Sequence, residues 1–380
     1  ALTREFVRTP SVLGTEAGMA DRVIEAMRSL AFDRVEVDLA GSVVGTIEGE
    51  ADGPTILLDA HMDTVDVLPE ADWTRDPFGG ELDDDRIWGR GATDMKGALA
   101  AMIHAAAGLD RSRLPGRVVV SASVEEERIE GAALRLVCER YSPDVVVIGE
   151  ATDLDLVIAG RGRVELAVRA GGRPAHASTP ELGQHAVHRM IDVVREIEAL
   201  PLDVHPAVGR GVMCLTDIVS EPYPAHSVVP SGCRATYERR LVPGETTETV
   251  LSALAGACER AGAPDTSVEI ARARLETYTG FRFDESKWLS PWAVEASHPV
   301  VIESLAALRG SGLEPALASY GFCTNAAYSA GAAGIPTIGF GPGREEQAHV
   351  VDEYLEVDQL LAACHGYRAL AAALTTTGPW

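Results

Sequence analysis

An apolar run near the start of the chain ends in side chains that could carry out chemistry. Residues 55–67 read TILLDAHMDTVDV, so a segment typical of a buried strand runs out into His61 and Asp63. Side chains two residues apart on a strand leave it on the same side. An imidazole beside a carboxylate can bind a metal or move a proton.

Other places along the chain present the same kinds of group. Two further apolar segments end in glutamates, a glycine-rich turn before an expected helix carries an aspartate, and a loop after a fourth apolar segment carries a histidine. These residues are Asp94, Glu125, Glu126, Glu127, Glu150 and His349. Because the carboxyl ends of parallel strands form the ligand crevice of an open sheet, we expect these side chains to meet at one rim.

Carboxylates gathered at one buried rim require a compensating positive charge. Like charges repel and are costly to remove from water, and Lys or Arg residues are sparse in these segments. Taken singly, each residue has an ordinary interpretation as a packed histidine, an N-cap aspartate or a solvated glutamate. Together they favour a pair of divalent cations, because mixed imidazole and carboxylate ligation is typical of hydrolytic zinc or cobalt sites.

The elements that must position these groups alternate along the chain. Residues 1–163 read as strands and helices in turn, with near-continuous apolar strands and a helix that Thr15 would cap. This rhythm predicts an α/β fold with a mostly parallel sheet flanked by helices. In residues 164–279 the strands alternate polar and apolar side chains, which predicts an inserted α+β domain with one solvated sheet face. Residues 280–380 return to the first pattern and complete the discontinuous large domain.

The composition narrows the classes of partner and compartment. A net charge of -24 repels nucleic acid and anionic membranes, so neither is an expected partner. No apolar segment approaches the length of about 18 residues that a membrane helix needs. The six cysteines are scattered and form no C-x-x-C pair, which favours reduced thiols and a cytoplasmic protein.

A series of motifs along the whole chain resembles a known family. The motifs are HMDTV, GRGATDMKGALAAM, SVEEE, GEAT, RPAHASTPELGQHAV, YERRLVPGE and GFGPGREEQAH. They resemble those of the di-zinc amidohydrolases and exopeptidases that include acetylornithine deacetylase, succinyl-diaminopimelate desuccinylase, aminoacylase and carboxypeptidase G. The segments GRGRVEL, YTGF and CTNAA are similar to a subgroup linked to selenium metabolism. The resemblance implies a phosphorylase/hydrolase-like catalytic domain with an inserted domain that serves as lid and dimer interface.

The resemblance also implies a role for each residue of the rim. Asp94 would bridge two ions, which we expect to be zinc, with cobalt or manganese as alternatives. The flanking ligands would be His61 and Glu150 at one ion, and Glu127 and His349 at the other. Asp63 would hydrogen-bond the far nitrogen of His61 and fix its tautomer.

The triplet of glutamates leaves two assignments open. The family usually reads Asp-Glu-Glu where this chain reads Glu-Glu-Glu. Counting from the strand makes Glu126 the general base and Glu127 the ligand, whereas the spacing to Gly131 would make Glu125 the base and Glu126 the ligand. We favour the first assignment.

Further candidates would contact the substrate. The resemblance implies that His176 donates to the substrate's carbonyl oxygen and that Arg240 clamps a carboxylate, with Arg239 or a solvated strand face as the alternative. Asn325 is expected to line the pocket. His226 stands where relatives commonly carry Asn, which puts an amide contact there in doubt.

These features together predict a metal-dependent amidohydrolase that cleaves an N-acyl amide on a small amino-acid-like substrate. An exopeptidase or dipeptidase with the same centre is the alternative enzyme, and a catalytically silent binding relative is the alternative of another class. The glycine-rich segments lack nucleotide-binding spacing, and Cys323 has no evident base partner for a thiol mechanism.

Overall fold

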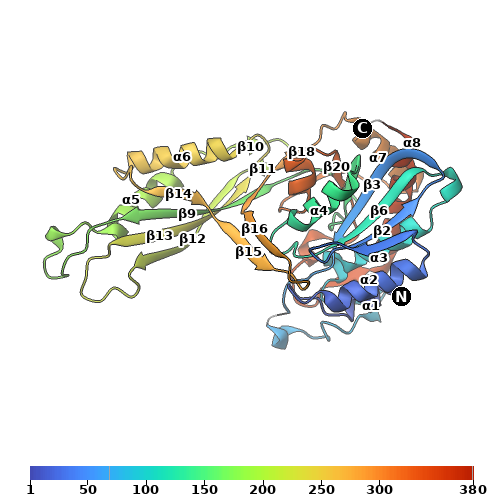
Figure 1. Ribbon diagram of the computed structural model, residues 1–380, viewed down its shortest axis with the longest axis horizontal. Coiled ribbons are helices and arrows are strands. Elements are labelled where there is room, and N and C mark those ends of the chain that lie inside the picture. Colours follow the sequence, from blue (N-terminus) through green and yellow to red (C-terminus); the bar gives the residue numbers. More distant parts are fainter. Residues whose placement is uncertain (68, 379) are drawn as a thin grey trace. The chain divides into compact units, whose positions relative to one another are not determined.

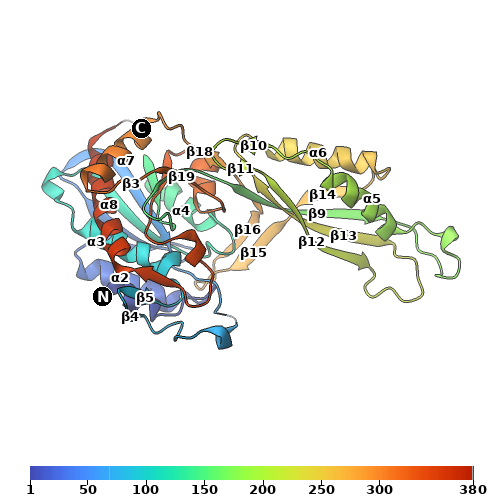
Figure 2. The ribbon, with the colours of Figure 1, turned by 180° about the vertical axis from the view of Figure 1, so that it is seen from behind.

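The computed structural model describes residues 1–67, 69–378 and 380, and the chain forms two compact units (Figures 1 and 2). Unit 1 comprises residues 1–160, 274–284 and 292–380, and unit 2 comprises residues 161–273 and 285–291. This division differs from the predicted bounds in two ways: residues 274–279, predicted in the insert, lie in the large unit, and residues 161–163 and 285–291, predicted in the large domain, lie in unit 2. In the large unit, the Tyr278 hydroxyl donates to the carbonyl oxygen of Gly41 at 2.7 Å.

A nine-stranded sheet forms the centre of unit 1. Its strand order is β1-β2-β6-β3-β7-β20-β8-β18, and β19 also pairs with β8. The strands are β1 (Arg34–Val37), β2 (Val43–Glu48), β3 (Ala51–His61), β6 (Pro115–Ser123), β7 (Val145–Ile148), β8 (Leu156–Gly160), β18 (Trp292–Ala293), β19 (Leu317–Tyr320) and β20 (Thr337–Gly339). The four middle strands β6, β3, β7 and β20 are parallel, while β1, β2 and β18 join antiparallel. The predicted α/β class with a mostly parallel central sheet is confirmed.

Helices cover both faces of this sheet, which explains its continuous apolar strands. The helices of unit 1 are α1 (Leu2–Val7), α2 (Ala17–Ser29), α3 (Gly97–Ala107), α4 (Ala132–Tyr141), α7 (Pro299–Gly310) and α8 (Val357–Thr376). Helices α3 and α8 lie side by side and contact β3 and β6 (Figure 2). Leu57 of β3 belongs instead to the cluster around α4. Ile56, Leu57 and Leu58 are therefore all fully buried, as strands covered on both faces require.

A small sheet and several short helical turns complete unit 1, and the N-terminus of helix α2 differs from the prediction. A small sheet contains β4 (Glu81–Asp83), β5 (Arg86–Trp88) and β21 (Tyr354–Glu356), and short helical turns occur at η1 (Glu70–Asp72), η2 (Ala92–Lys96), η3 (Arg111–Arg113), η5 (Ala327–Ala332) and η6 (Glu345–Gln347). The predicted cap of α2 is wrong: Glu16 is the N-cap, and the Thr15 hydroxyl donates to the carbonyl of Val12 instead.

Unit 2 is an antiparallel sheet with two helices packed against it. Strand order is β12-β13-β9-β14, and β17 also pairs with β9. The elements are β9 (Gly162–Gly171), η4 (Pro180–Leu182), α5 (Ala186–Glu198), β10 (Val204–His205), β11 (Gly209–Arg210), β12 (Val212–Glu221), β13 (Gly232–Leu241), α6 (Thr247–Arg260), β14 (Ser267–Ile270) and β17 (Trp288–Leu289). The β15 (Arg272–Glu276) and β16 (Arg282–Ser286) hairpin crosses the boundary between the units.

The alternating strands of unit 2 bury one face. Every second residue of β9 is buried, and Val164, Leu166 and Val168 pack in a cluster that includes residues of α5 and α6. The intervening residues are only partly covered, which is the pattern expected of a sheet with one solvated face.

Two absences concern the whole described chain. Within residues 1–67, 69–378 and 380, no helix combines the length and the apolar character that a bilayer crossing needs. All six cysteines carry free thiols.

Candidate metal centre

Adjacent parallel strands deliver the first set of polar side chains. His61 is the last residue of β3, Glu150 follows the end of β7 by two residues, and the triplet from Glu125 to Glu127 follows β6. Since β6, β3 and β7 are neighbours and run parallel, their carboxyl ends open at the same edge of the sheet. The sheet therefore brings an imidazole and several carboxylates to one place, as the sequence pattern predicts.

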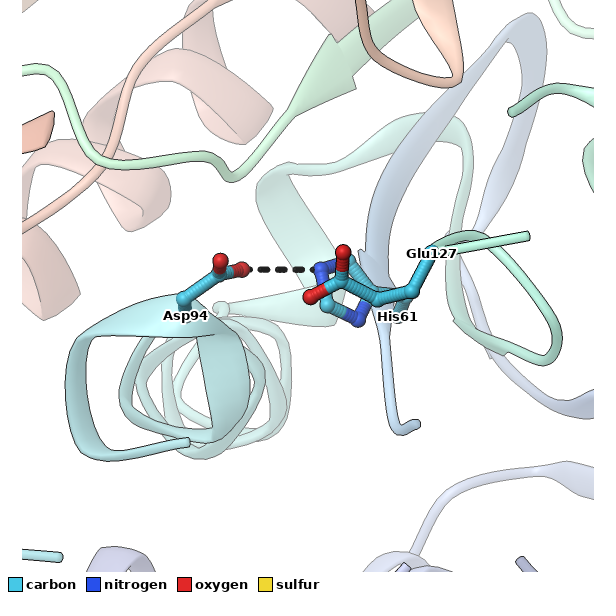
Figure 3. A group of neighbouring side chains, drawn as sticks. All are labelled: His61, Asp94 and Glu127. Atoms are coloured by element: carbon cyan, nitrogen blue, oxygen red, sulfur yellow. Dashed lines mark hydrogen bonds and ion pairs between the residues drawn. The ribbon is translucent and has the colours of Figure 1, made fainter. Parts of the chain in front are cut away.

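Asp94 lies between two histidines that are far apart in the sequence. Its Oδ1 atom is 3.0 Å from Nε2 of His61, and its Oδ2 atom is 3.1 Å from Nε2 of His349. Figure 3 shows the Asp94 carboxylate pointing from the turn before α3 toward His61, with Glu127 beside them. One carboxylate thus offers a separate oxygen to each imidazole, which is the arrangement of a bridging ligand.

Two glutamates complete two overlapping groups of possible ligands. Glu127 Oε1 is 2.9 Å from Nε2 of His349, and Glu150 Oε1 is 3.6 Å from Nε2 of His61. The ligand atoms of His61, Asp94 and Glu127 all lie within 4.8 Å of one another. Those of His61, Glu126 and Glu150 meet the same limit.

The pKa values in this cluster reflect burial and crowded negative charge. Burial, followed by the charge of Asp94, raises the pKa of both Glu127 and Glu150. Burial opposes ionisation of Asp94, but the hydrogen bonds from His349 and His61 outweigh it and lower the pKa of Asp94. The hydrogen bonds to Asp94 and Glu127 raise the pKa of His349 to about 10.

These donors fit divalent metal ions. Burial raises the pKa of Glu126 well above its ordinary value, and its Oε1 atom has no hydrogen-bond partner. In His61, burial would lower the imidazole pKa, but the hydrogen bond to Asp94 and the nearby carboxylates raise it. A dication held between these groups would keep the carboxylates ionised and offset their mutual repulsion. Oxygen and nitrogen donors in this mixture suit zinc, cobalt or manganese.

The second contact of His61 differs from the predicted one. Its Nδ1 atom is 3.0 Å from the backbone carbonyl oxygen of Asp63, whereas the Asp63 carboxylate is 3.7 Å away. The carbonyl, which can only accept, therefore holds a proton on Nδ1. The other ring nitrogen, Nε2, which contacts Asp94, is then the atom that would offer its lone pair to a metal. The Asp63 carboxylate instead accepts the backbone N–H of Glu127 at 3.1 Å and so positions the glutamate loop.

The three glutamates have different surroundings. Glu126 and Glu127 each belong to one of the two candidate ligand groups, and Glu125 belongs to neither among the described residues. Glu125 is fully buried beside Arg128, whose guanidinium nitrogen is 3.5 Å from its Oε2 atom. This geometry is compatible with Glu126 as base and Glu127 as ligand.

Asn325 has contacts that do not support the predicted pocket-lining role. Only 3% of its surface is exposed, and its amide nitrogen donates to Asp59 at 2.8 Å and to Ser123 at 3.0 Å. Its Oδ1 atom accepts the backbone N–H of Gly131 at 2.6 Å. The amide therefore ties the loop after β6 to strands β3 and β6.

The candidates in unit 2 gather on neighbouring segments. His176 pairs with Val228 as an isolated bridge, and the N–H of Ala177 donates to the carbonyl of Ser227 at 3.1 Å. This pairing brings the exposed His176 and His226 onto adjacent chain segments. His176 also contacts the Ser178 hydroxyl at 2.7 Å.

The two neighbouring arginines of β13 are clearly different. Arg239 is buried and pairs with the buried carboxylate of Glu245. Arg240 is half-buried on the opposite face of the strand, where its guanidinium is 2.7 Å from Glu238. The alternative clamp Arg239 therefore has a partner inside unit 2, and Arg240 remains the candidate for an external carboxylate.

Glu353 is not among the predicted site residues, yet it is fully buried and its carboxylate contacts the loop that carries Asp94. Its position four residues after His349 is the signal that could have indicated a role.

The central strands of the sheet are parallel, and two overlapping groups of imidazole and carboxylate side chains lie at their carboxyl ends. This is the architecture of a metal-dependent hydrolase. The sequence profile of peptidase family M20/M25/M40 matches residues 57–373. The chain belongs to this family, whose members are metal-dependent hydrolases acting on amide bonds. The predicted family and reaction class are confirmed, and the selenium-linked subgroup stays a prediction.

Relatives cover almost the whole chain. The uncharacterized protein YgeY of Escherichia coli (strain K12) is 30% identical over 384 residues, which covers 98% of this chain and 94% of that protein. A succinyl-diaminopimelate desuccinylase of Cereibacter sphaeroides is 29% identical over 375 residues, with 95% and 94% covered. An acetylornithine deacetylase of Buchnera aphidicola is 29% identical over 318 residues, with 79% and 76% covered.

Solved structures share the fold at lower identity. Aminopeptidase PepT from Bacillus cereus has a TM-score of 0.76 at 20% identity and covers 98% of this chain and 96% of its own. The YXEP protein of Bacillus subtilis, described as a dinuclear metal binding peptidase from the M20 family, has a TM-score of 0.74 at 16% identity, with 99% and 97% covered.

Proposed function

We propose that this chain binds two divalent metal ions and hydrolyses an N-acyl amide on a small amino-acid-like substrate. His61, Asp94 and Glu150 would hold one ion, and Asp94, Glu127 and His349 would hold the other, with zinc expected and cobalt or manganese as alternatives. The observation that supports this most is the Asp94 carboxylate, whose two oxygens lie 3.0 Å and 3.1 Å from two different imidazoles.

In the proposed reaction the metal ions and the protein's side chains would have separate roles. Divalent ions in such a pair polarise a carbonyl oxygen and lower the pKa of water. The Glu126 carboxylate would take a proton from the attacking water and pass it to the leaving amine. The His176 imidazole would donate a hydrogen bond to the carbonyl oxygen as negative charge develops there.

Substrate recognition would rest on side chains of unit 2. The Arg240 guanidinium would bind the substrate carboxylate, exchanging its present partner Glu238 for that group. His226 would add a contact of its own beside His176. Asn325 would act through the loop after β6 and not by touching the substrate.

The acyl group is the less defined part of the substrate. Two relatives named as a desuccinylase and a deacetylase support an N-acyl amino acid. A dipeptide or other exopeptidase substrate presents the same amide and carboxylate, so the same centre would serve it. A panel of N-acyl amino acids and dipeptides separates the two.

The assembly and compartment are also proposals. Strand β12 lies at the edge of the unit 2 sheet and exposes Val212 and Ile218, which supports a homodimer formed through the insert. The free cysteines support a reducing, cytoplasmic location. The net charge of -24 argues against nucleic acid or anionic membranes as partners.

The test is a metal analysis coupled to an activity screen. The purified protein is analysed for metal before and after dialysis against a chelator, and each sample is assayed on the substrate panel. We expect about two ions per chain. We also expect the chelator to abolish hydrolysis and added Zn²⁺ or Co²⁺ to restore it. Absence of metal uptake would leave a silent binding relative as the correct description.

A further inference from the structure

Glu353 makes a dense set of hydrogen bonds to the loop that carries Asp94. Its side chain is 0% exposed. Its Oε2 atom accepts from the Arg90 guanidinium at 2.8 Å and from the backbone N–H of Gly91 at 3.1 Å. Its Oε1 atom accepts from the backbone N–H groups of Thr93 at 2.8 Å and Asp94 at 3.0 Å. Four donors from a five-residue loop therefore converge on one carboxylate.

Backbone contacts join the same two segments. The N–H of Gly89 donates to the carbonyl of Glu353 at 2.8 Å, and the Thr93 hydroxyl donates to the carbonyl of Tyr354 at 2.6 Å. Tyr354 also pairs with Trp88 where β21 meets β5. The segment after His349 is thus fixed to the glycine-rich loop along its length.

The two metal positions differ in what supports their ligands. His61 is the last residue of β3 and Glu150 lies two residues after the end of the neighbouring strand β7, and both side chains are buried. Asp94 lies in an irregular turn with φ -118° and ψ 92°, and His349 lies in a loop with φ 61°. His349 is also 52% exposed, against 1% for His61. The Asp94–His349 separation therefore depends on how the two loops are joined.

We propose that Glu353 is a positioning residue that fixes Asp94 relative to His349 and so forms the metal position of Asp94, Glu127 and His349, which we term the loop site. The inference rests on the proposed two-metal function. Asp94 is shared with the other position, which we term the strand site, but the remaining ligands of the strand site, His61 and Glu150, follow strands of the central sheet. The loss of Glu353 therefore weakens the loop site more. Residues that hold metal ligands in place typically contribute about 10- to 100-fold in metal affinity.

Glu353→Gln is the main variant. Glutamine has nearly the same shape but one acceptor oxygen, and its amide would face N–H donors with another N–H. Two of the four donors are then left without an acceptor. Glu356→Gln is the matched control, since Glu356 lies on the same segment and its partly exposed carboxylate is 3.8 Å from the guanidinium of Arg86.

Thr93→Val is a milder variant that keeps the buried carboxylate. It removes the hydroxyl that bonds to Tyr354, while Thr93→Ser retains a hydroxyl and serves as its control. If Glu353→Gln fails to fold, as judged by circular dichroism, the comparison of these two Thr93 variants carries the test.

The experiment is a titration of metal-free protein with Zn²⁺ against a chromophoric chelator. The unaltered protein is expected to bind two ions per chain. Glu353→Gln is expected to bind one ion with nearly unchanged affinity and the other about 10- to 100-fold more weakly. Thr93→Val shifts the same ion by a few-fold, and both controls bind as the unaltered protein does. A purely structural role would lower thermal stability without this unequal effect.

The outcomes separate this inference from the proposed function. If the unaltered protein binds no pair of ions, the proposed function fails and the inference falls with it. If it binds two ions and Glu353→Gln holds both as tightly, or weakens both equally, only the inference is overturned. If the Thr93→Val and Thr93→Ser variants bind Zn²⁺ with equal affinities, the inference is also overturned.

Discussion

Replacing Glu126 and Glu127 one at a time by glutamine should produce opposite defects. Glu126 has one carboxylate oxygen without a hydrogen-bond partner, and its ligand atom lies within 4.8 Å of His61 and Glu150. Glu127 contacts His349 at 2.9 Å. Glu126→Gln removes a proton acceptor and leaves the proposed ligands in place. Glu127→Gln removes a charged ligand and leaves the base.

The expected loss of activity follows from these roles. General acid–base catalysis contributes about 10²- to 10⁴-fold, or roughly 3–5 kcal/mol in the activation barrier. Glu126→Gln should therefore lower kcat by that factor and still hold two ions. Glu127→Gln should hold about one ion, and excess metal should partly restore its activity.

The assay measures metal content by elemental analysis and kcat on an N-acyl amino acid for the same protein samples. Glu125→Gln is the third variant, and we expect it to retain both ions and most of its activity. The reasoning is refuted if Glu126→Gln loses an ion while Glu125→Gln loses turnover, because that result assigns Glu125 as base and Glu126 as ligand.

Three further predictions concern stability and binding. Burial, with the charge of Asp63 second, raises the pKa of Glu16 from 4.5 to about 7. The folded state therefore binds more protons than the unfolded state, and the free energy of unfolding falls as the pH rises through that window. In urea unfolding of the metal-free protein, the loss of unfolding free energy between pH 5 and pH 8 should be smaller for Glu16→Gln than for the unaltered protein, by up to about 3 kcal/mol. Arg239→Met should cost about 3–5 kcal/mol because it leaves a buried carboxylate unpaired, whereas Arg240→Met should keep the melting temperature and raise KM. Equal melting temperatures for the two arginine variants would contradict this contrast. Asn325→Ala should cost about 1–3 kcal/mol for each buried group left without a partner, and an unchanged unfolding midpoint would exclude its role in tying the loop to the sheet.

Much of the metal centre was predictable because it depends on sheet geometry. The continuous apolar run from Ile56 to Leu58 indicates a strand covered on both faces, and neighbouring parallel strands must end at one edge. The meeting of His61, Glu127 and Glu150 follows from this geometry. These residues are far apart in the sequence, but the order and direction of the strands place them side by side.

Contacts made through loops were not predictable in the same way. Whether His61 meets the carboxylate or the carbonyl of Asp63 depends on the path of the backbone after β3, which residue types do not specify. Glu353 reads as one more acidic residue in a polar segment. Its burial depends on a loop some 260 residues earlier in the chain, whose N–H groups replace water around the carboxylate. Asn325 likewise has partners from three separate segments.

The path of the chain through unit 2 bears on how family members can be recombined. Strand β17 (Trp288–Leu289) lies outside the long segment of residues 161–273 but pairs with β9 within the same unit. A chimaera that exchanged only residues 161–273 with a relative would match a foreign β9 to the native β17. An exchange of the whole of unit 2 between family members therefore requires both of its segments, with four junctions instead of two.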